Sequence, residues 1–132
     1  EKTMATGFPA VTGDIFTAAD YNGLVTFEVK ADQTGDYTLV LNDSYQLLIP
    51  MNKATAIALK IPTNATAAIP VGSVVTILNK GAGLCTISAV TPGTTTVLSA
   101  GATAASPTLA QYKSAACIKT GTDAWYVVGA IA

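Results

Sequence analysis

Three aspartates, Asp32, Asp36 and Asp43, have a spacing that could support chemistry in this 132-residue chain. Two carboxylates at a suitable separation can act as the acid and the base of a glycoside hydrolase. Asp32 and Asp36 could instead bind Ca²⁺ together with backbone carbonyls. Asp is also favoured at turns, because its side chain hydrogen-bonds to its own backbone. We interpret all three as turn residues and keep a carboxylate-only glycoside hydrolase as a remote alternative.

The chain contains no His and no Arg. The absence of His removes the commonest general base and transition-metal ligand, and the absence of Arg removes the side chain that grips phosphate in a bidentate manner. The Lys residues are scattered and form no basic stripe typical of nucleic-acid binding, and neither GxxxxGK[ST] nor GxGxxG occurs. We therefore predict a protein that is not an enzyme, with no catalytic residue, cofactor, metal or nucleic-acid partner.

Aromatic side chains offer another kind of chemistry, the stacking of a ring on a sugar. Trp125 and Tyr126 are adjacent and must point to opposite faces of a strand. We expect Trp125 to lie in the core with its indole N–H hydrogen-bonded, which leaves Tyr126 outside. Exposed aromatic residues need partners but often contact other subunits instead. The candidate ligand contacts are Tyr45, Tyr112 and Tyr126.

Charged residues make up only 11% of the chain, whereas hydrophobic residues make up 50%; a soluble domain carries about 25% charged residues. No segment approaches the roughly 20 continuous apolar residues of a membrane helix, so we expect no membrane insertion. The polar start at residues 1–4 shows no sign of a secretory signal. Charge depletion is typical of buried interface cores, so we predict an obligate oligomer of this chain.

Cys85 and Cys117 both lie in apolar, strand-like segments. A free Cys in such a setting behaves as a small buried hydrophobic residue. A disulfide between them is geometrically feasible, but a pairing cannot be read from sequence. We expect two inert thiols and leave the question of a bridge open.

Short apolar segments separated by turn residues follow Gly23, at roughly the spacing of 8–12 residues that is typical of an all-β sandwich or barrel. We predict an all-β fold, an antiparallel β-sandwich or barrel-like domain. Residues 74–78 and 84–90 are expected to pair as one hairpin, with the intervening glycines supplying positive φ. Residues 111–119 and 124–129 are expected to form another, and no internal repeat is evident. The remaining predicted strands cover residues 24–30, 37–41, 46–49, 57–61 and 95–99.

Residues 1–23 precede this β-domain, which we place at 24–132. The first part reads as an extended arm, because glycine and proline interrupt it. Thr17-Ala18-Ala19-Asp20 is typical of a helix N-terminus, and Gly23 marks the end of this short helix. The arm has too few large apolar residues to fold alone, so we predict that it is a docking element. Its expected anchors are Phe8, Ile15 and Phe16.

Three segments together resemble small β-domains of tailed-bacteriophage virion proteins. Residues 12–22, TGDIFTAADYN, are similar to a GD-x-x-TA-x-x-x-N segment near the start of many tail-fibre and appendage proteins. Residues 69–77, IPVGSVVTI, followed by the glycines 81 and 83, are similar to the core of fibre-tip and head-decoration modules. Residues 125–131, WYVVGAI, are similar to the W-x-[VL]-x-G hairpin that closes those modules.

The resemblance covers about residues 12–131. It implies a structural protein at the virion surface, a homotrimer that decorates a capsid or caps a fibre, with other virion proteins as partners. It supplies no catalytic residues. The absence of long shaft repeats departs from fibre proteins and favours a fibre tip, a small head fibre or a capsid decoration protein. A host-receptor or carbohydrate-binding module that contacts a host-surface glycan is the alternative expectation.

Overall fold

The computed structural model describes residues 15, 17–25, 28–44, 47–99 and 106–132. This part of the chain consists mostly of strands in two mixed sheets, together with helix α2 (Ala18–Val25) and a short 3₁₀ helix, η1 (Leu41–Asp43). In spatial order, the six-stranded sheet contains β1 (Glu28–Val29), β3 (Leu47–Met51), β5 (Val74–Asn79), β9 (Ser114–Gly121), β10 (Ala124–Gly129) and β7 (Thr96–Leu98). The four-stranded sheet contains β2 (Tyr37–Thr38), β4 (Ile57–Ile61), β6 (Cys85–Ala89) and β8 (Thr108–Leu109).

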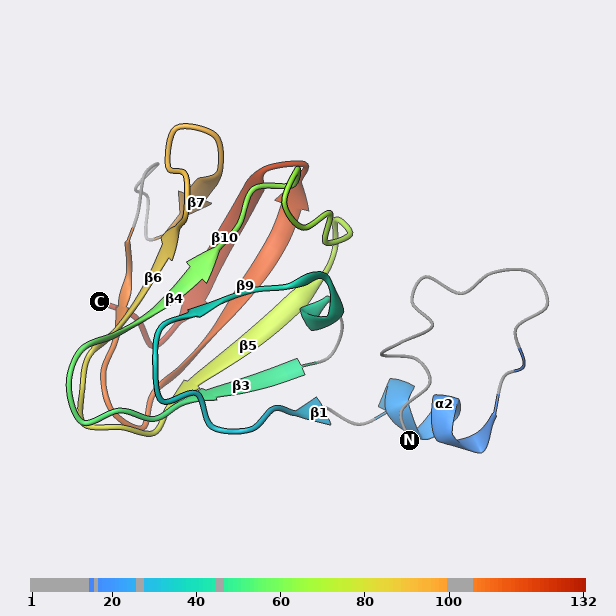
Figure 1. The fold of residues 1–132 in the computed structure, drawn as a ribbon, viewed down its shortest axis with the longest axis horizontal. Helices are drawn as coiled ribbons and strands as arrows, with labels where there is room; N and C mark the ends of the chain where they lie inside the picture. The colour runs from blue at the N-terminus through green and yellow to red at the C-terminus, as the bar shows by residue number, and fades with distance from the viewer. Residues whose placement is uncertain (1–14, 16, 26–27, 45–46, 100–105) are drawn as a thin grey trace.

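From β1 to β6 the chain alternates between the two sheets and so winds around their shared core (Figure 1). Each strand pairs in parallel with the strand one turn later, β1 with β3 and β3 with β5, and likewise β2 with β4 and β4 with β6. The predicted β-rich fold is confirmed, but the predicted antiparallel arrangement is wrong for these turns. The predicted hairpin of 74–78 with 84–90 is also wrong, because β5 and β6 lie in different sheets. Turn residues mark where a strand ends and not which sheet the next strand joins.

The second turn of this winding (β3 and β4) and the third turn (β5 and β6) repeat each other with a step of 28 residues. Leu47 pairs with Val75, and Ile57 pairs with Cys85, so both sheets share this register. The loops that follow carry the same hydrogen bonds, from the N–H groups of residues 66 and 67 to the Thr63 carbonyl and from those of 94 and 95 to the Thr91 carbonyl. The repeat was not evident in the sequence because it conserves buried positions and turn geometry rather than residue identity.

Gly81 and Gly83 allow the third turn to pass close to the second. A Cβ at Gly81 would lie 2.2 Å from the Lys53 carbonyl oxygen, and one at Gly83 would lie 1.7 Å from that of Thr55. Neither glycine has positive φ, so the prediction that hairpin geometry explains them is wrong. Close backbone approach, the other common reason for glycine, explains both.

The predicted hairpin of 111–119 with 124–129 is confirmed, since β9 and β10 are antiparallel neighbours. Strand β9 also pairs antiparallel with β5, and β10 pairs in parallel with β7. The hairpin therefore extends the sheet that the winding began. At the edge of the other sheet, the backbone of Ala132 exchanges hydrogen bonds with that of Thr108.

The core lies between the two sheets and takes the inward side chain of every second strand residue, as strand geometry requires. Trp125 is almost completely buried there, as expected. Cys85 and Cys117 are both buried and carry free thiols in this structure. Burial raises the pKa of the Cys85 thiol to about 11 and that of the Cys117 thiol to about 12.

Helix α2 begins where the sequence predicted but continues through Gly23 to Val25. An interior glycine costs a helix only about 1 kcal/mol, which is a weak stop signal on its own. The predicted strand at 24–30 is correspondingly reduced to Glu28–Val29. In Figure 1 the helix lies beyond β1 and outside the pair of sheets. In the described part of the chain, no helix is long and apolar enough to cross a membrane.

Candidate interaction surfaces

The outer side of the six-stranded sheet carries no charged residue at its outward strand positions. Along β5, β9 and β10, buried residues alternate with exposed or half-exposed ones, and the latter share the outward side. In β3, Pro50 is buried although it pairs with the outward Leu78. We call this surface the charge-free face. It consists of Val29, Leu48, Val74, Thr76, Leu78, Thr96, Leu98, Ser114, Ala116, Ile118, Thr120, Ala124, Tyr126 and Val128.

The strand register makes the apolar part of this face continuous. Val74 lies opposite Ile118, Ile118 opposite Tyr126, and Tyr126 opposite Leu98, which gives an apolar row across four strands. Tyr126 is 45% exposed in the middle of this row. Contiguous apolar surface of this kind marks interaction sites on soluble proteins.

The outer side of the four-stranded sheet has a different composition. Its outward positions are mostly hydroxyl-bearing, and we call it the hydroxyl face. It consists of Thr38, Ala58, Lys60, Thr86, Ser88 and Thr108. Such residues remain favourably hydrated when they are exposed, so this face needs no covering partner.

The two described tyrosines among the candidate ligand contacts, Tyr112 and Tyr126, do not form one site. Tyr126 belongs to the charge-free face, whereas Tyr112 lies in the turn before β9 and is 79% exposed. Tyr45 lies outside the described residues. Any ligand contact through Tyr112 and any through Tyr126 would therefore be separate.

Tyr112 has a backbone conformation that is unusual for its residue type. Its φ is 64°, in the left-handed region that favours glycine. Its N–H donates to the Asn79 carbonyl at 2.7 Å, which holds the turn against the end of β5. A non-glycine residue with positive φ costs about 1–3 kcal/mol of folding free energy, and such residues cluster at functional sites.

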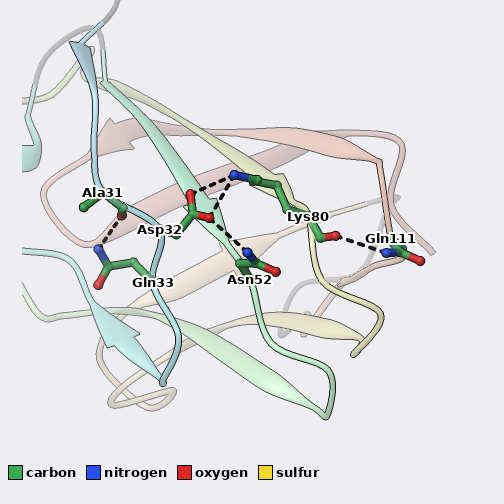
Figure 2. Close-up of polar contacts among 6 residues, drawn as sticks. All are labelled: Ala31, Asp32, Gln33, Asn52, Lys80 and Gln111. Atoms are coloured by element: carbon green, nitrogen blue, oxygen red, sulfur yellow. Dashed lines mark hydrogen bonds and ion pairs between the residues drawn. The ribbon is translucent and has the colours of Figure 1, made fainter.

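Asp32 belongs to a polar cluster that connects successive turns of the winding (Figure 2). The Lys80 ammonium donates to both carboxylate oxygens of Asp32, at 2.8 and 3.0 Å, and the Asn52 amide donates to one of them at 2.9 Å. Gln111 donates to the Lys80 carbonyl at 3.1 Å. The hydrogen bonds from Lys80 and Asn52 lower the pKa of Asp32. The cluster is exposed to solvent, so it contributes little to stability.

The other two candidate carboxylates have structural partners of their own. Asp36 accepts a hydrogen bond from the Ala58 N–H at 2.9 Å. Asp43 is buried, and one of its oxygens accepts from the Tyr37 hydroxyl at 2.6 Å and from the Val40 N–H at 2.8 Å. Burial and the Asp43 carboxylate raise the pKa of Tyr37. Among the described residues no cluster of potential metal ligands occurs.

A buried lysine is the feature that sequence reasoning missed. Lys119 is only 2% exposed, and its ammonium donates to the Asn64 side-chain oxygen at 2.7 Å and to the Ile69 carbonyl at 2.6 Å. It also lies 5.9 Å from the centre of the Trp125 ring. Lys119 lies two residues after the buried Cys117 on β9, so its side chain points to the same inward side. This alternation could have indicated that Lys119 is buried.

Of the three docking-arm residues, only Ile15 is described, and it is 81% exposed. Phe8 and Phe16 lie outside the described residues. The docking role of the arm therefore stays a prediction.

Comparison with known proteins gives no relative of this chain. No family model, no curated protein and no solved structure matches it.

Proposed function

We propose that this protein is a non-enzymatic structural subunit of a bacteriophage virion, a homotrimer that forms a fibre tip, a head fibre or a capsid decoration. The charge-free face carries this proposal. Its fourteen outward positions lack any charge in a chain that has few charges to distribute. The resemblance of residues 12–131 to small virion β-domains supports the choice of a phage particle, with the two sheets acting as one sandwich-like module.

The physical argument for assembly rests on what the fold itself requires. The core requires only the inward residues of the sheets. The outward residues of the hydroxyl face are mostly polar and stay hydrated when exposed. Apolar side chains on the charge-free face gain free energy only when another surface covers them, by about 25 cal/mol per Å² of apolar area. A face without charge can meet its own copy without like-charge repulsion. Three copies can therefore enclose a shared apolar centre around a threefold axis.

The test is a measurement of mass in solution and of location on particles. Multi-angle light scattering of the full chain at micromolar concentration should give three times the chain mass. Antibody labelling of purified particles in the electron microscope should place the protein at a fibre end or on the capsid surface. A stable monomer in solution together with unlabelled particles would refute the proposal.

The N-terminal arm is the proposed attachment to the rest of the particle. Ile15 is exposed, and helix α2 lies outside the pair of sheets, so neither is taken up by the core of its own chain. Deleting residues 1–16 should leave the β-sheet circular dichroism unchanged and abolish incorporation into particles. If the shortened chain incorporates normally, the attachment surface lies on the β-domain instead.

Tyr112 favours a second candidate function, contact with a host receptor or glycan. An exposed aromatic residue on a strained turn costs stability, and such strain is typical of functional sites. Tyr112→Ala should then reduce adsorption of particles to host cells about tenfold or more without changing oligomer mass. Unchanged adsorption would leave assembly as the function supported by the structure.

A further inference from the structure

Lys119 departs from the usual pairing of buried lysines. A lysine is almost never fully buried unless a carboxylate neutralises it. The side-chain partner of Lys119 is the neutral amide of Asn64, at 2.7 Å, and its other acceptor is the backbone carbonyl of Ile69. Within the described part of the chain, Lys119 forms no ion pair. A buried ammonium with only these neutral acceptors has no negatively charged partner to compensate its charge, so the contact between Lys119 and Asn64 needs another explanation.

One property of its surroundings, burial, raises the neutral fraction of the Lys119 amine. Burial lowers the pKa of this lysine, although the charge of Asp123 opposes the shift. The Trp125 ring covers one side of the amine. A lysine that is desolvated in an apolar pocket becomes a nucleophile, because a larger fraction of it is unprotonated.

The backbone of Asn64, whose side-chain amide faces this amine, is held in place. The backbone N–H of Asn64 donates to one oxygen of Asp123 at 2.8 Å, and the Thr95 hydroxyl donates to the same oxygen at 3.2 Å. Because Nζ lies 2.7 Å from Oδ1, it is also within reach of the carbonyl carbon Cγ of Asn64. Reacting atoms fixed in contact gain a large rate advantage over free ones.

We propose that Lys119 and Asn64 are the site of an intramolecular isopeptide bond. The neutral Nζ of Lys119 attacks Cγ of Asn64, and the resulting tetrahedral intermediate expels the side-chain nitrogen Nδ2. The proton lost by Nζ is transferred to Nδ2, so the products are a secondary amide and one molecule of ammonia. No oxidant, metal or cofactor takes part. Asn64 is half-exposed, which gives the ammonia an exit.

The bond would connect two parts of the fold that are far apart in sequence. Lys119 belongs to β9 of the closing hairpin, and Asn64 lies in the loop after β4 of the winding. A covalent link between them would prevent the hairpin from separating from the turns. A crosslink that closes a long loop stabilises mainly by restricting the unfolded chain. This would suit a subunit exposed on the outside of a particle, but it does not depend on the proposed virion role.

Intact-mass spectrometry of the purified full chain tests the proposal directly. The mass should lie about 17 Da, one ammonia, below the sequence mass, and a protease digest should contain a branched peptide that joins Lys119 to Asn64. Lys119→Arg and Asn64→Ser should each abolish the branched peptide and lower Tm by about 10 °C or more. Lys60→Arg, a lysine on the hydroxyl face, is the matched control and should retain both the branched peptide and the Tm.

Two results would overturn the proposal. One is an intact mass equal to the sequence mass with both residues recovered in unmodified peptides. The other is a loss of ammonia that persists in Lys119→Arg, because that would come from cyclisation of an asparagine with its own backbone. Asp123→Ala removes the oxygen that accepts from the Asn64 N–H, and it should slow formation of the branched peptide at least tenfold while the β-sheet circular dichroism persists.

Discussion

The two outer faces of this molecule differ although the sheets that carry them share one core. The four-stranded sheet shows mostly Thr and Ser to solvent, whereas the six-stranded sheet shows a row from Val74 to Leu98 that contains no polar atom except the Tyr126 hydroxyl. Both sheets place apolar side chains in the shared core, and the six-stranded sheet adds the buried Asn79 and Lys119. The demands of folding therefore cannot explain the difference. It supports the proposal that solvent lies outside the four-stranded sheet and another protein surface outside the six-stranded sheet.

Both faces require that successive turns of the winding stack closely. We therefore expect the largest effect on folding stability from a substitution where two turns meet. Gly83→Ala would place a Cβ 1.7 Å from the Thr55 carbonyl oxygen, and the backbone would have to shift. We expect a loss of about 3 kcal/mol or more in the free energy of unfolding, measured by urea denaturation. Gly35 has open space around its Cβ position. Gly35→Ala should be neutral or stabilise by about 0.5 kcal/mol; equal losses in both variants would contradict the stacking argument.

The contrast between inner and outer positions can be tested on two adjacent residues of β10. Trp125 is buried between the sheets, and Tyr126 lies on the charge-free face. Trp125→Ala should cost about 3–5 kcal/mol of folding stability, because it leaves a large cavity. Tyr126→Ala should cost under about 1 kcal/mol in the monomer and act on association instead. If Trp125→Ala folds with normal stability, the assignment of Trp125 to the core is wrong.

The contrast between the two outer faces can be tested by placing a charge on each. Tyr126→Lys would bury an unpaired ammonium in the proposed subunit interface. We expect it to weaken association by about 3 kcal/mol, roughly a hundredfold in the association constant, measured by analytical ultracentrifugation. Ser88→Lys puts the same charge on the hydroxyl face and should leave association unchanged. Equal effects of the two substitutions would remove the distinction on which the proposed interface rests.

The sequence contained the local features of this fold but not its topology. The closing hairpin, the burial of Trp125 and the start of α2 follow from alternation and capping, which are local properties. The parallel winding does not, because the same turn residues serve a hairpin and a crossing between sheets. Its repeat of 28 residues is a pattern of buried positions and not of residue identity, as the different residues at the equivalent positions Leu47 and Val75 show.

The candidate surfaces were predictable to a similar degree. Scarcity of charge indicated an interface, but its location on one sheet required the strand order, which brings β5, β9, β10 and β7 together from distant parts of the chain. The Lys119 cluster was missed because Lys is normally exposed and its partner Asn64 belongs to a remote loop. Asp32 was predicted to be a turn residue that bonds its own backbone, whereas its carboxylate accepts from Lys80 and Asn52, and these contacts depend on how the turns of the winding stack.

The smallest effects are expected at the cysteines, where the inner and outer sides of one strand can be compared directly. Cys85 points into the core from β6, and Ser88 lies on the hydroxyl side of the same strand. The thiolate is the reactive form of cysteine, and burial raises the pKa of Cys85 to about 11 and that of Cys117 to about 12.

At pH 8 both native thiols should therefore remain protonated and shielded, and a thiol reagent should label neither within an hour while the chain is folded. Ser88→Cys should add one thiol that reacts within minutes, and denaturant should release the other two. Rapid labelling of Cys85 or Cys117 under native conditions would mean that the sheets separate readily. Labelling of neither thiol in denaturant without reductant would instead reveal a disulfide between them, and the two sheets would then be joined by a covalent bond as well as by a shared core.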